Sequence, residues 1–373
     1  SRAAVADTGA AKAAYMPSFS ANAEYGRAEG FDPAVTNGGS TAAVLHVEAT
    51  LIDGGVRSAS FEAAKAKLRQ AEAIERQRRA DVAFEVRSAY FTALAKASER
   101  GIQEETAATL TEYDAWLGRQ ERQGLAAPGE VERAALARLA AEANARTAAS
   151  DLVAAEAALV SLTGASVPTA GLAEPAIESS ADLSPDAVSA AIDAAPVAAD
   201  ARAALDAAER EAEAVRSERF GAVKVGADVG ALGVQPDTTF RRDHGAQFLL
   251  QLTVPVFDPA FSQRLAAAVA RGGVARANLE EARRTVALAL VRTDADLRRA
   301  DTDLAAARKA APLAMRQFEL VRARNAGGGS VRLLEVLDAL TQSVEARANV
   351  SRALFTRRVA VATRAQVLGD ATP

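Results

Sequence analysis

The chain has 373 residues, no cysteine, two histidines and a formal net charge of −4 at pH 7. The lack of cysteine excludes disulfides, thiolate nucleophiles and zinc–thiolate sites. The near-neutral charge, without a basic block, gives no reason to expect a nucleic-acid partner. Hydrophobic residues make up 49% of the chain, with alanine the commonest of them, but aromatic residues only 5%. Because alanine forms helices well and buries little area per residue, this composition favours closely packed long helices over a thick globular core.

No run of about 18 apolar residues is present, so the sequence predicts no transmembrane helix. A barrel strand needs only about 9–11 alternating residues, which is a much fainter signal. The sequence starts at Ser1-Arg2-Ala3 without a signal peptide. We therefore expect a processed or trimmed N-terminus, and an N-terminal lipid anchor stays an open question.

The first half of the chain predicts two strands and two helices. Alternating residues predict strands at about 17–27 and 41–52. A long helix without proline is expected at about 56–123, and a return helix at about 128–162. A helix of some 65 residues extends about 100 Å at 1.5 Å per residue, a length typical of coiled coils, solenoids or tunnels.

The second half repeats this plan after a helix expected at about 185–218, which Pro196 should break or kink. Its strands are expected at about 220–231 and 246–257, and its helices at about 259–325 and 330–368. The Pro- and Ser-containing stretch 165–184 is interpreted as a linker or equatorial segment. We therefore expect a first repeat at 1–164 and a second repeat at 185–373.

Five pairs of positions, each about 205 residues apart, indicate an internal duplication. They are Leu45 with Leu250, Asp53 with Asp258, Gly124 with Gly329, Glu130 with Glu335, and Gly164 with Gly369. Asp53 and Asp258 follow strands and precede helices, so both are expected to cap the strand–helix junctions.

The four expected strands carry apolar residues on one face and polar residues on the other. A half-buried strand pair on a soluble core is the commoner origin of such a pattern. Four strands cannot close a barrel, however, and the rest of the chain is Ala-rich helix that offers no other core. Three chains with four strands each would close a twelve-stranded barrel, with apolar faces toward lipid and polar faces toward a wet lumen.

Several local patterns resemble the TolC-like outer-membrane efflux proteins. They are Ala14-Tyr15-Met16-Pro17-Ser18-Phe19, Leu51-Ile52-Asp53-Gly54-Gly55, Val256-Phe257-Asp258, Val86-Arg87-Ser88-Ala89-Tyr90-Phe91, Gly124-Leu125-Ala126, and Leu334-Glu335-Val336-Leu337-Asp338-Ala339. The resemblance implies an α+β membrane protein: a homotrimer with a twelve-stranded β-barrel in the outer membrane, continued by a periplasmic α-helical barrel. It further implies a passive export duct of a tripartite efflux or type I secretion system in a Gram-negative bacterium. Its partners would be outer-membrane lipid, a periplasmic adaptor and an inner-membrane pump, and no cofactor is expected.

Glu335 and Asp338 are three residues apart and lie on one face of a helix near its first turn. Acidic residues there can merely offset the helix dipole. The resemblance instead places this face at the periplasmic gate, where three copies would gather six mutually repelling carboxylates. Glu130 holds the equivalent place in the first repeat and is explained by capping alone.

Gly124, Leu125 and Ala126 are interpreted as an adaptor-docking site at the first helix turn, with Gly329 and Ser330 at the equivalent second turn. A glycine cap with its usual hydrophobic contact explains the same residues, and both interpretations can hold. His46 and His244 are too few and too far apart to suggest a metal site.

Two alternatives remain from the sequence alone: a periplasmic adaptor and a soluble structural coiled-coil protein. An adaptor has one helical hairpin flanked by small β domains, whereas here strand pairs precede each of two hairpins. An enzyme is not expected, because no catalytic triad, phosphate loop or metal-ligand spacing is present. The sequence does not identify the cargo.

Overall fold

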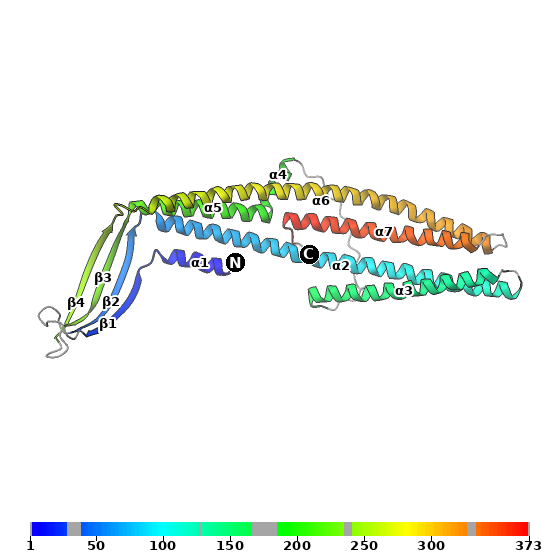
Figure 1. Cartoon of the computed structure of the whole chain (residues 1–373), viewed down its shortest axis with the longest axis horizontal. Helices are drawn as coiled ribbons and strands as arrows, with labels where there is room; N and C mark the ends of the chain where they lie inside the picture. The colour runs from blue at the N-terminus through cyan, green and yellow to red at the C-terminus, as the bar shows by residue number, and fades with distance from the viewer. Residues whose placement is uncertain are drawn as a thin grey trace. The chain divides into compact units, whose positions relative to one another are not determined.

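In a computed structural model, the chain is mostly helical with one four-stranded antiparallel sheet (Figure 1). The structure describes residues 2–27, 39–124, 126, 128–165, 185–234, 241–326 and 333–371. The chain divides into two compact units. The strand unit comprises Ser1–Glu75 and Val197–Arg284, and the hairpin unit comprises Arg76–Pro196 and Thr285–Pro373.

The strand unit contains the whole sheet, in the order β1-β2-β3-β4. Its strands are β1 (Ser18–Arg27), β2 (Gly39–Ile52), β3 (Ala222–Val234) and β4 (Arg241–Thr253). The helix α1 (Arg2–Ala13) precedes β1, and α5 (Pro196–Ser217) with the short helix η2 (Glu218–Phe220) precedes β3. The long helices α2 (Val56–Arg122) and α6 (Phe261–Ala326) start directly after β2 and β4.

In the strand register, apolar residues mostly pair with apolar residues and polar residues with polar ones. Among the apolar residues, Phe19 pairs with Val47, Leu45 with Val229, and Ala227 with Phe248; among the polar residues, Ser20 pairs with His46, His46 with Asp228, and Lys224 with Gln251. Because residues directly opposite in an antiparallel pair share a face, the sheet has one mainly apolar and one mainly polar face. Val44 and Leu249 are exceptions, since both lie in the polar register.

Three details of the sheet differ from the sequence expectation: one register shift, and the bounds of β3 and of β4, which are Ala222–Val234 and Arg241–Thr253 instead of about 220–231 and 246–257. A register shift between Thr50 and Ile52 pairs Ile52, not Leu51, with Val223, so Leu51 leaves the simple alternation as residues in a β-bulge do. The strand β4 ends at Thr253, ahead of the expected end at 257. Pro255 explains this end, because proline has no N–H to donate to the ladder.

Small residues bring the helices of the strand unit close together. Ala59, Ala66 and Ala73 are buried at seven-residue intervals on α2, and Ala203 and Ala207 are buried on α5. Ion pairs flank these contacts, joining α5 to α2 through Lys67–Glu211 (2.6 Å) and to α6 through Arg276–Glu209 (2.8 Å).

The hairpin unit holds the return helices α3 (Pro128–Thr163) and α7 (Leu333–Leu368), together with α4 (Pro185–Ala194). Buried alanines on α3 recur every seven residues, at Ala134, Ala141, Ala148 and Ala155. Two of them meet leucines of α2, in the clusters that contain Leu110 with Ala141 and Leu117 with Ala134. In Figure 1, α3 lies along α2, and α7 along α6.

Pro196 separates two helices, whereas the glycines and the proline inside α6 do not interrupt that helix. The helix expected at 185–218 is split into α4 and α5 at Ala195, because Pro196 starts a new helix. In contrast, α6 continues through Gly272, Gly273 and Pro312. Glycine costs only about 1 kcal/mol in a helix, so the glycine pair does not stop it.

Across the described residues, no helix has the length and apolar character required to cross a membrane.

Candidate functional site

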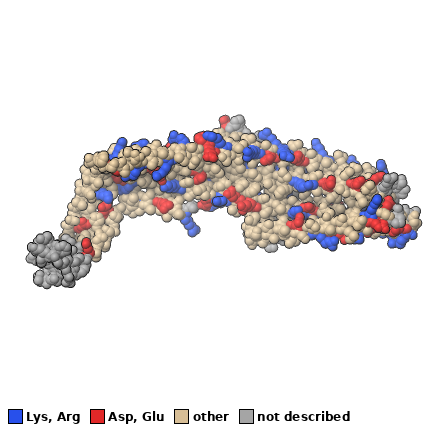
Figure 2. All heavy atoms as spheres, in the orientation of Figure 1, with Lys and Arg blue, Asp and Glu red and all other residues tan. Residues whose placement is uncertain are grey.

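The apolar face of the sheet is uncovered in the single chain. Phe19 and Phe248 are 77% and 85% exposed, and Leu45, Leu250 and Leu252 are each more than half exposed. A soluble protein rarely exposes contiguous apolar surface of this kind. Figure 2 shows few charged side chains over the strands in that view, whereas acidic and basic side chains alternate along the helices. This face therefore requires an apolar partner.

The polar face carries a hydrogen-bonded network that connects three strands. Lys224 Nζ on β3 donates to Glu48 Oε1 on β2 at 2.9 Å. His46 Nδ1 on β2 is bonded to Asp228 Oδ1 on β3, and Gln247 Nε2 on β4 donates to Asp228 Oδ2 at 2.6 Å. The sequence alone does not reveal the contact between His46 and Asp228, because the two residues lie far apart in the chain and only the β2–β3 register brings them together.

Each strand–helix junction contains an aspartate that accepts hydrogen bonds from the start of the next helix. Asp53 accepts from the backbone N–H of Gly55 (3.1 Å) and of Arg57 (3.0 Å), and from Arg57 Nε (2.7 Å). Burial raises the pKa of Asp53, but these three hydrogen bonds outweigh it and hold the pKa below its usual value. Asp258 accepts from the Ala260 N–H (2.9 Å) and from Arg264 (2.8 Å).

At the turn between α2 and α3, the described residues form a small apolar cluster. Leu117, Ala134 and Leu333 are buried there, and Trp116 and Ala126 pack against them. Gly124 is exposed and has a φ of +72°, a value that favours glycine. Leu125, Gly329 and Ser330 lie outside the described residues, so their proposed docking role stays a prediction.

Glu335 and Asp338 lie on an exposed face of α7, in its first turns. The opposite face, with Val336, Ala339 and Leu340, is buried. The two carboxylates therefore point away from the packed interior of their own chain. Within the described part of the chain, no group of three His, Asp or Glu side chains is placed to hold a metal ion.

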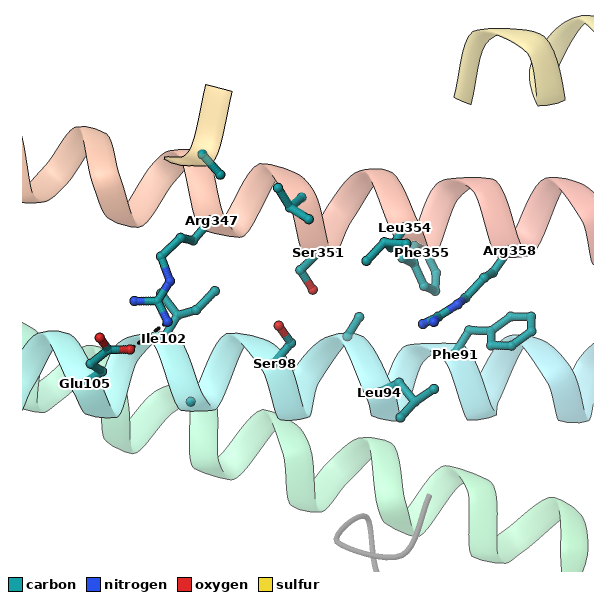
Figure 3. Close-up of a pocket in the computed structure, with 14 residues that line it drawn as sticks. Phe91, Leu94, Ser98, Ile102, Glu105, Arg347, Ser351, Leu354, Phe355 and Arg358 are labelled. Atoms are coloured by element: carbon teal, nitrogen blue, oxygen red, sulfur yellow. Dashed lines mark hydrogen bonds and ion pairs between the residues drawn. The ribbon is translucent and has the colours of Figure 1, made fainter. Parts of the chain in front are cut away.

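A groove of about 710 Å³ lies between α2 and α7 in the hairpin unit (Figure 3). Near one end, Arg347 of α7 pairs with Glu105 of α2 at 2.6 Å. At the other end, Arg358 lies over the ring of Phe91 at 5.9 Å. Ser98 and Ser351 face each other between these ends (Figure 3). These small side chains leave the two helices incompletely packed along this stretch.

A family model described as "Outer membrane efflux protein" matches residues 1–165 and 187–370. The chain belongs to the outer membrane efflux protein family. It is an efflux channel of the outer membrane that extends into the periplasm. This finding decides against the two alternatives, the periplasmic adaptor and the soluble coiled-coil protein, and the family is one of channels rather than of enzymes.

Solved structures of low sequence identity share the fold of this efflux protein. A membrane protein from Pseudomonas aeruginosa aligns with a TM-score of 0.84 at 22% identity, covering 98% of this chain and 88% of that one. VceC from Vibrio cholerae aligns with a TM-score of 0.81 at 16% identity, covering 99% and 90%. The Campylobacter jejuni outer membrane channel CmeC gives 0.81 at 14% identity, covering 99% and 81%. A search of curated proteins finds no match.

Proposed function

We propose that three copies of the chain close a twelve-stranded barrel, four strands from each copy, and form a passive export duct. The exposed apolar face of the sheet carries this proposal, because lipid is the partner that such a face fits. The sheet order leaves β1 and β4 as edges, and β4 of one copy can pair antiparallel with β1 of the next. The polar network then lines the lumen.

The helices supply a second argument for assembly. On α3, Leu139, Val153 and Val160 recur at multiples of seven residues and are exposed, although α3 already buries its alanine face against α2. A helix with two apolar seams fits between two neighbours. We infer that the second seam packs on a neighbouring copy, so that the helices form a hollow periplasmic barrel.

The repeated lengths of the elements support an internal duplication. The long helices have 67 and 66 residues, and the return helices have 36 each. We propose a first repeat at 1–164, a linker or equatorial segment at 165–184 and a second repeat at 185–373. In both repeats, the junction aspartates Asp53 and Asp258 would fix how the helix leaves its strand.

Crosslinking can test the barrel, because the chain has no native cysteine. Cysteine at Ala23 of β1, combined with a series of cysteines along β4, should give disulfide-linked dimers and trimers in the outer membrane. Ala43→Cys with Ala231→Cys is the matched control, since these residues pair within one sheet and should link only within the chain. A protein that stays monomeric in detergent and never crosslinks between copies would refute the barrel.

We propose that Glu335 and Asp338 form the periplasmic gate. Their exposed face supports this role, since three copies would bring six carboxylates around one axis, where they bind cations and repel one another. Glu335→Ala with Asp338→Ala should raise single-channel conductance in planar bilayers and weaken block by multivalent cations. Glu130→Ala with Arg133→Ala is the matched control at the equivalent positions of α3. Unchanged conductance and block would remove the gate assignment.

Docking of a periplasmic adaptor, itself linked to an inner-membrane pump, is proposed at the two helix turns. The first turn comprises Gly124, Leu125 and Ala126, and the second Gly329 and Ser330. The apolar cluster against which Ala126 packs holds this part of the first turn in place, and this supports docking there. A photo-crosslinking residue at position 125 should capture the adaptor in cells, whereas one at Ala143 on α3 should not.

A further inference from the structure

His46 lies between two carboxylates on the polar face of the sheet. Its Nδ1 is bonded to Asp228, and its Nε2 lies 3.8 Å from Glu48 Oε2. Lys224 also belongs to this cluster, because it pairs with Glu48. On the neighbouring strand β1, the residues that flank His46 are the uncharged Ser18, Ser20 and Asn22, and Glu24 lies further along. On β4, Gln247 contacts the cluster through Asp228.

The same geometry suits both protonation states of the imidazole. The neutral ring donates from Nδ1 to Asp228, and a proton added at Nε2 faces the Glu48 carboxylate. Imidazole is the side chain that ordinarily titrates between about pH 5 and 8. The side chains of His46 and Glu48 are about one-third exposed, so water can deliver the proton without any rearrangement of the strands.

Protonation changes the balance of charge in the cluster. Glu48 and Asp228 contribute −1 each and Lys224 contributes +1, so these three sum to −1. Neutral His46 leaves this value unchanged, whereas protonated His46 brings it to zero. Three copies around one lumen would therefore lose three negative charges together. A negative wall concentrates cations, and this effect reaches about one Debye length into the solution.

We propose that His46 determines the ion selectivity of the barrel lumen: the channel prefers cations while His46 is neutral and loses much of this preference when His46 is protonated. The inference depends on the proposed barrel, which places the polar face in the lumen. A purely structural role for the cluster predicts a different result, because replacing His46 would then lower stability and leave selectivity unchanged.

Reversal potentials in planar bilayers test this under a tenfold KCl gradient whose dilute side is 10 mM, where the Debye length is about 30 Å. Between pH 8 and pH 5, the K⁺/Cl⁻ permeability ratio of the unmodified channel should fall about threefold, which corresponds to a change of about half kT in lumen potential. His46→Gln should keep a high ratio at both pH values, and His46→Lys a low ratio at both. Under a threefold KCl gradient whose dilute side is 1 M, the effect of pH on the permeability ratio should vanish, since the Debye length there is about 3 Å or less.

His244 provides the control, because the chain has only these two histidines. It pairs with Ala231, in the register of the apolar face, so His244→Gln should behave like the unmodified channel. The inference is wrong if His46→Gln keeps the pH dependence of the unmodified channel. His46→Gln fixes the neutral state of this position and His46→Lys the positive state, so either variant that inserts decides the matter. An unmodified protein that forms no conducting trimer refutes the proposed barrel and the inference with it.

Discussion

The two helical hairpins resemble each other in the lengths of their helices, with 67 and 36 residues in one and 66 and 36 in the other. They differ in the contacts that hold the two helices together. In the α2/α3 hairpin, apolar seams of alanine and leucine make the contact, and its ion pairs Lys96–Asp151 and Arg138–Asp114 remain partly exposed. In the α6/α7 hairpin, two arginines lie inside the contact. Arg357 is paired with Asp301, and Arg364 Nε lies 3.1 Å from Asp294.

The α6/α7 pairs fix the register of the two helices. Asp294 and Asp301 are seven residues apart, as are Arg357 and Arg364, so a slip along the axis would separate both pairs together. A buried charge without its partner is costly, whereas a partly exposed pair contributes little. Charge therefore holds α6 and α7 in one register, while α2 and α3 depend mainly on side-chain packing.

The largest expected effect comes from breaking the ion pair of a buried arginine. Asp301→Ala removes one carboxylate from the guanidinium of Arg357, whose side chain is only 7% exposed although that of Asp301 is 49% exposed, and should cost about 3 kcal/mol of stability. Thermal unfolding in detergent, followed by circular dichroism, measures the loss. Lys96→Met in the α2/α3 hairpin should cost less than about 1 kcal/mol.

A double replacement sharpens this result. Asp301→Leu with Arg357→Met removes both charges and keeps apolar contacts, so it should recover most of the loss. If Asp301→Ala and Lys96→Met lower the unfolding temperature equally, charge does not distinguish the two hairpins.

The ends of the return helices give the next largest effect. Gly164 follows α3 and Gly369 follows α7, with φ values of +68° and +75°. A Cβ at Gly164 would meet nothing within 4 Å, but one at Gly369 would lie 2.3 Å from Pro196 Cγ. Gly164→Ala should cost about 1 kcal/mol, from backbone conformation alone. Gly369→Ala should cost about 2–3 kcal/mol, because it adds a clash with a buried ring. Equal unfolding temperatures of the two variants would contradict this contrast.

The smallest effect is expected at the strand–helix junctions. Asp53 accepts two backbone N–H groups and Asp258 accepts one, so Asp53→Ala should cost about 1 kcal/mol and Asp258→Ala less. The pKa of Asp53 is lowered in the folded chain. Its stabilising effect is therefore present above the unfolded pKa of about 4 and is lost as the pH falls through the lower folded value.

Unfolding temperatures at pH 7 and pH 3 test this dependence. The difference between the unmodified protein and Asp53→Ala should shrink at pH 3. A difference that stays constant or grows on acidification would show that the carboxylate of Asp53 does not act as a charged cap.

Local patterns in the sequence predicted the class of the fold. Alternation predicted four strands, and the sheet confirms them; long Ala-rich stretches predicted a mostly helical chain, which is also confirmed. The His46–Asp228 and Arg357–Asp301 contacts could not be predicted, because each depends on the register between elements far apart in the chain. The proposed gate and docking residues came from resemblance, since spacing alone does not distinguish Glu335 and Asp338 from ordinary acids in a first helical turn.

The two edge strands of the sheet constrain how the protein reaches the membrane. Among the described residues, β1 and β4 each have a neighbour on one side only, and the apolar face beside them is bare. Unpaired edges of this kind recruit further strands indiscriminately and promote aggregation. A monomer that has not yet assembled is therefore prone to aggregate. It must be bound by a carrier protein, or it must insert into the membrane faster than it meets misfolded copies of itself.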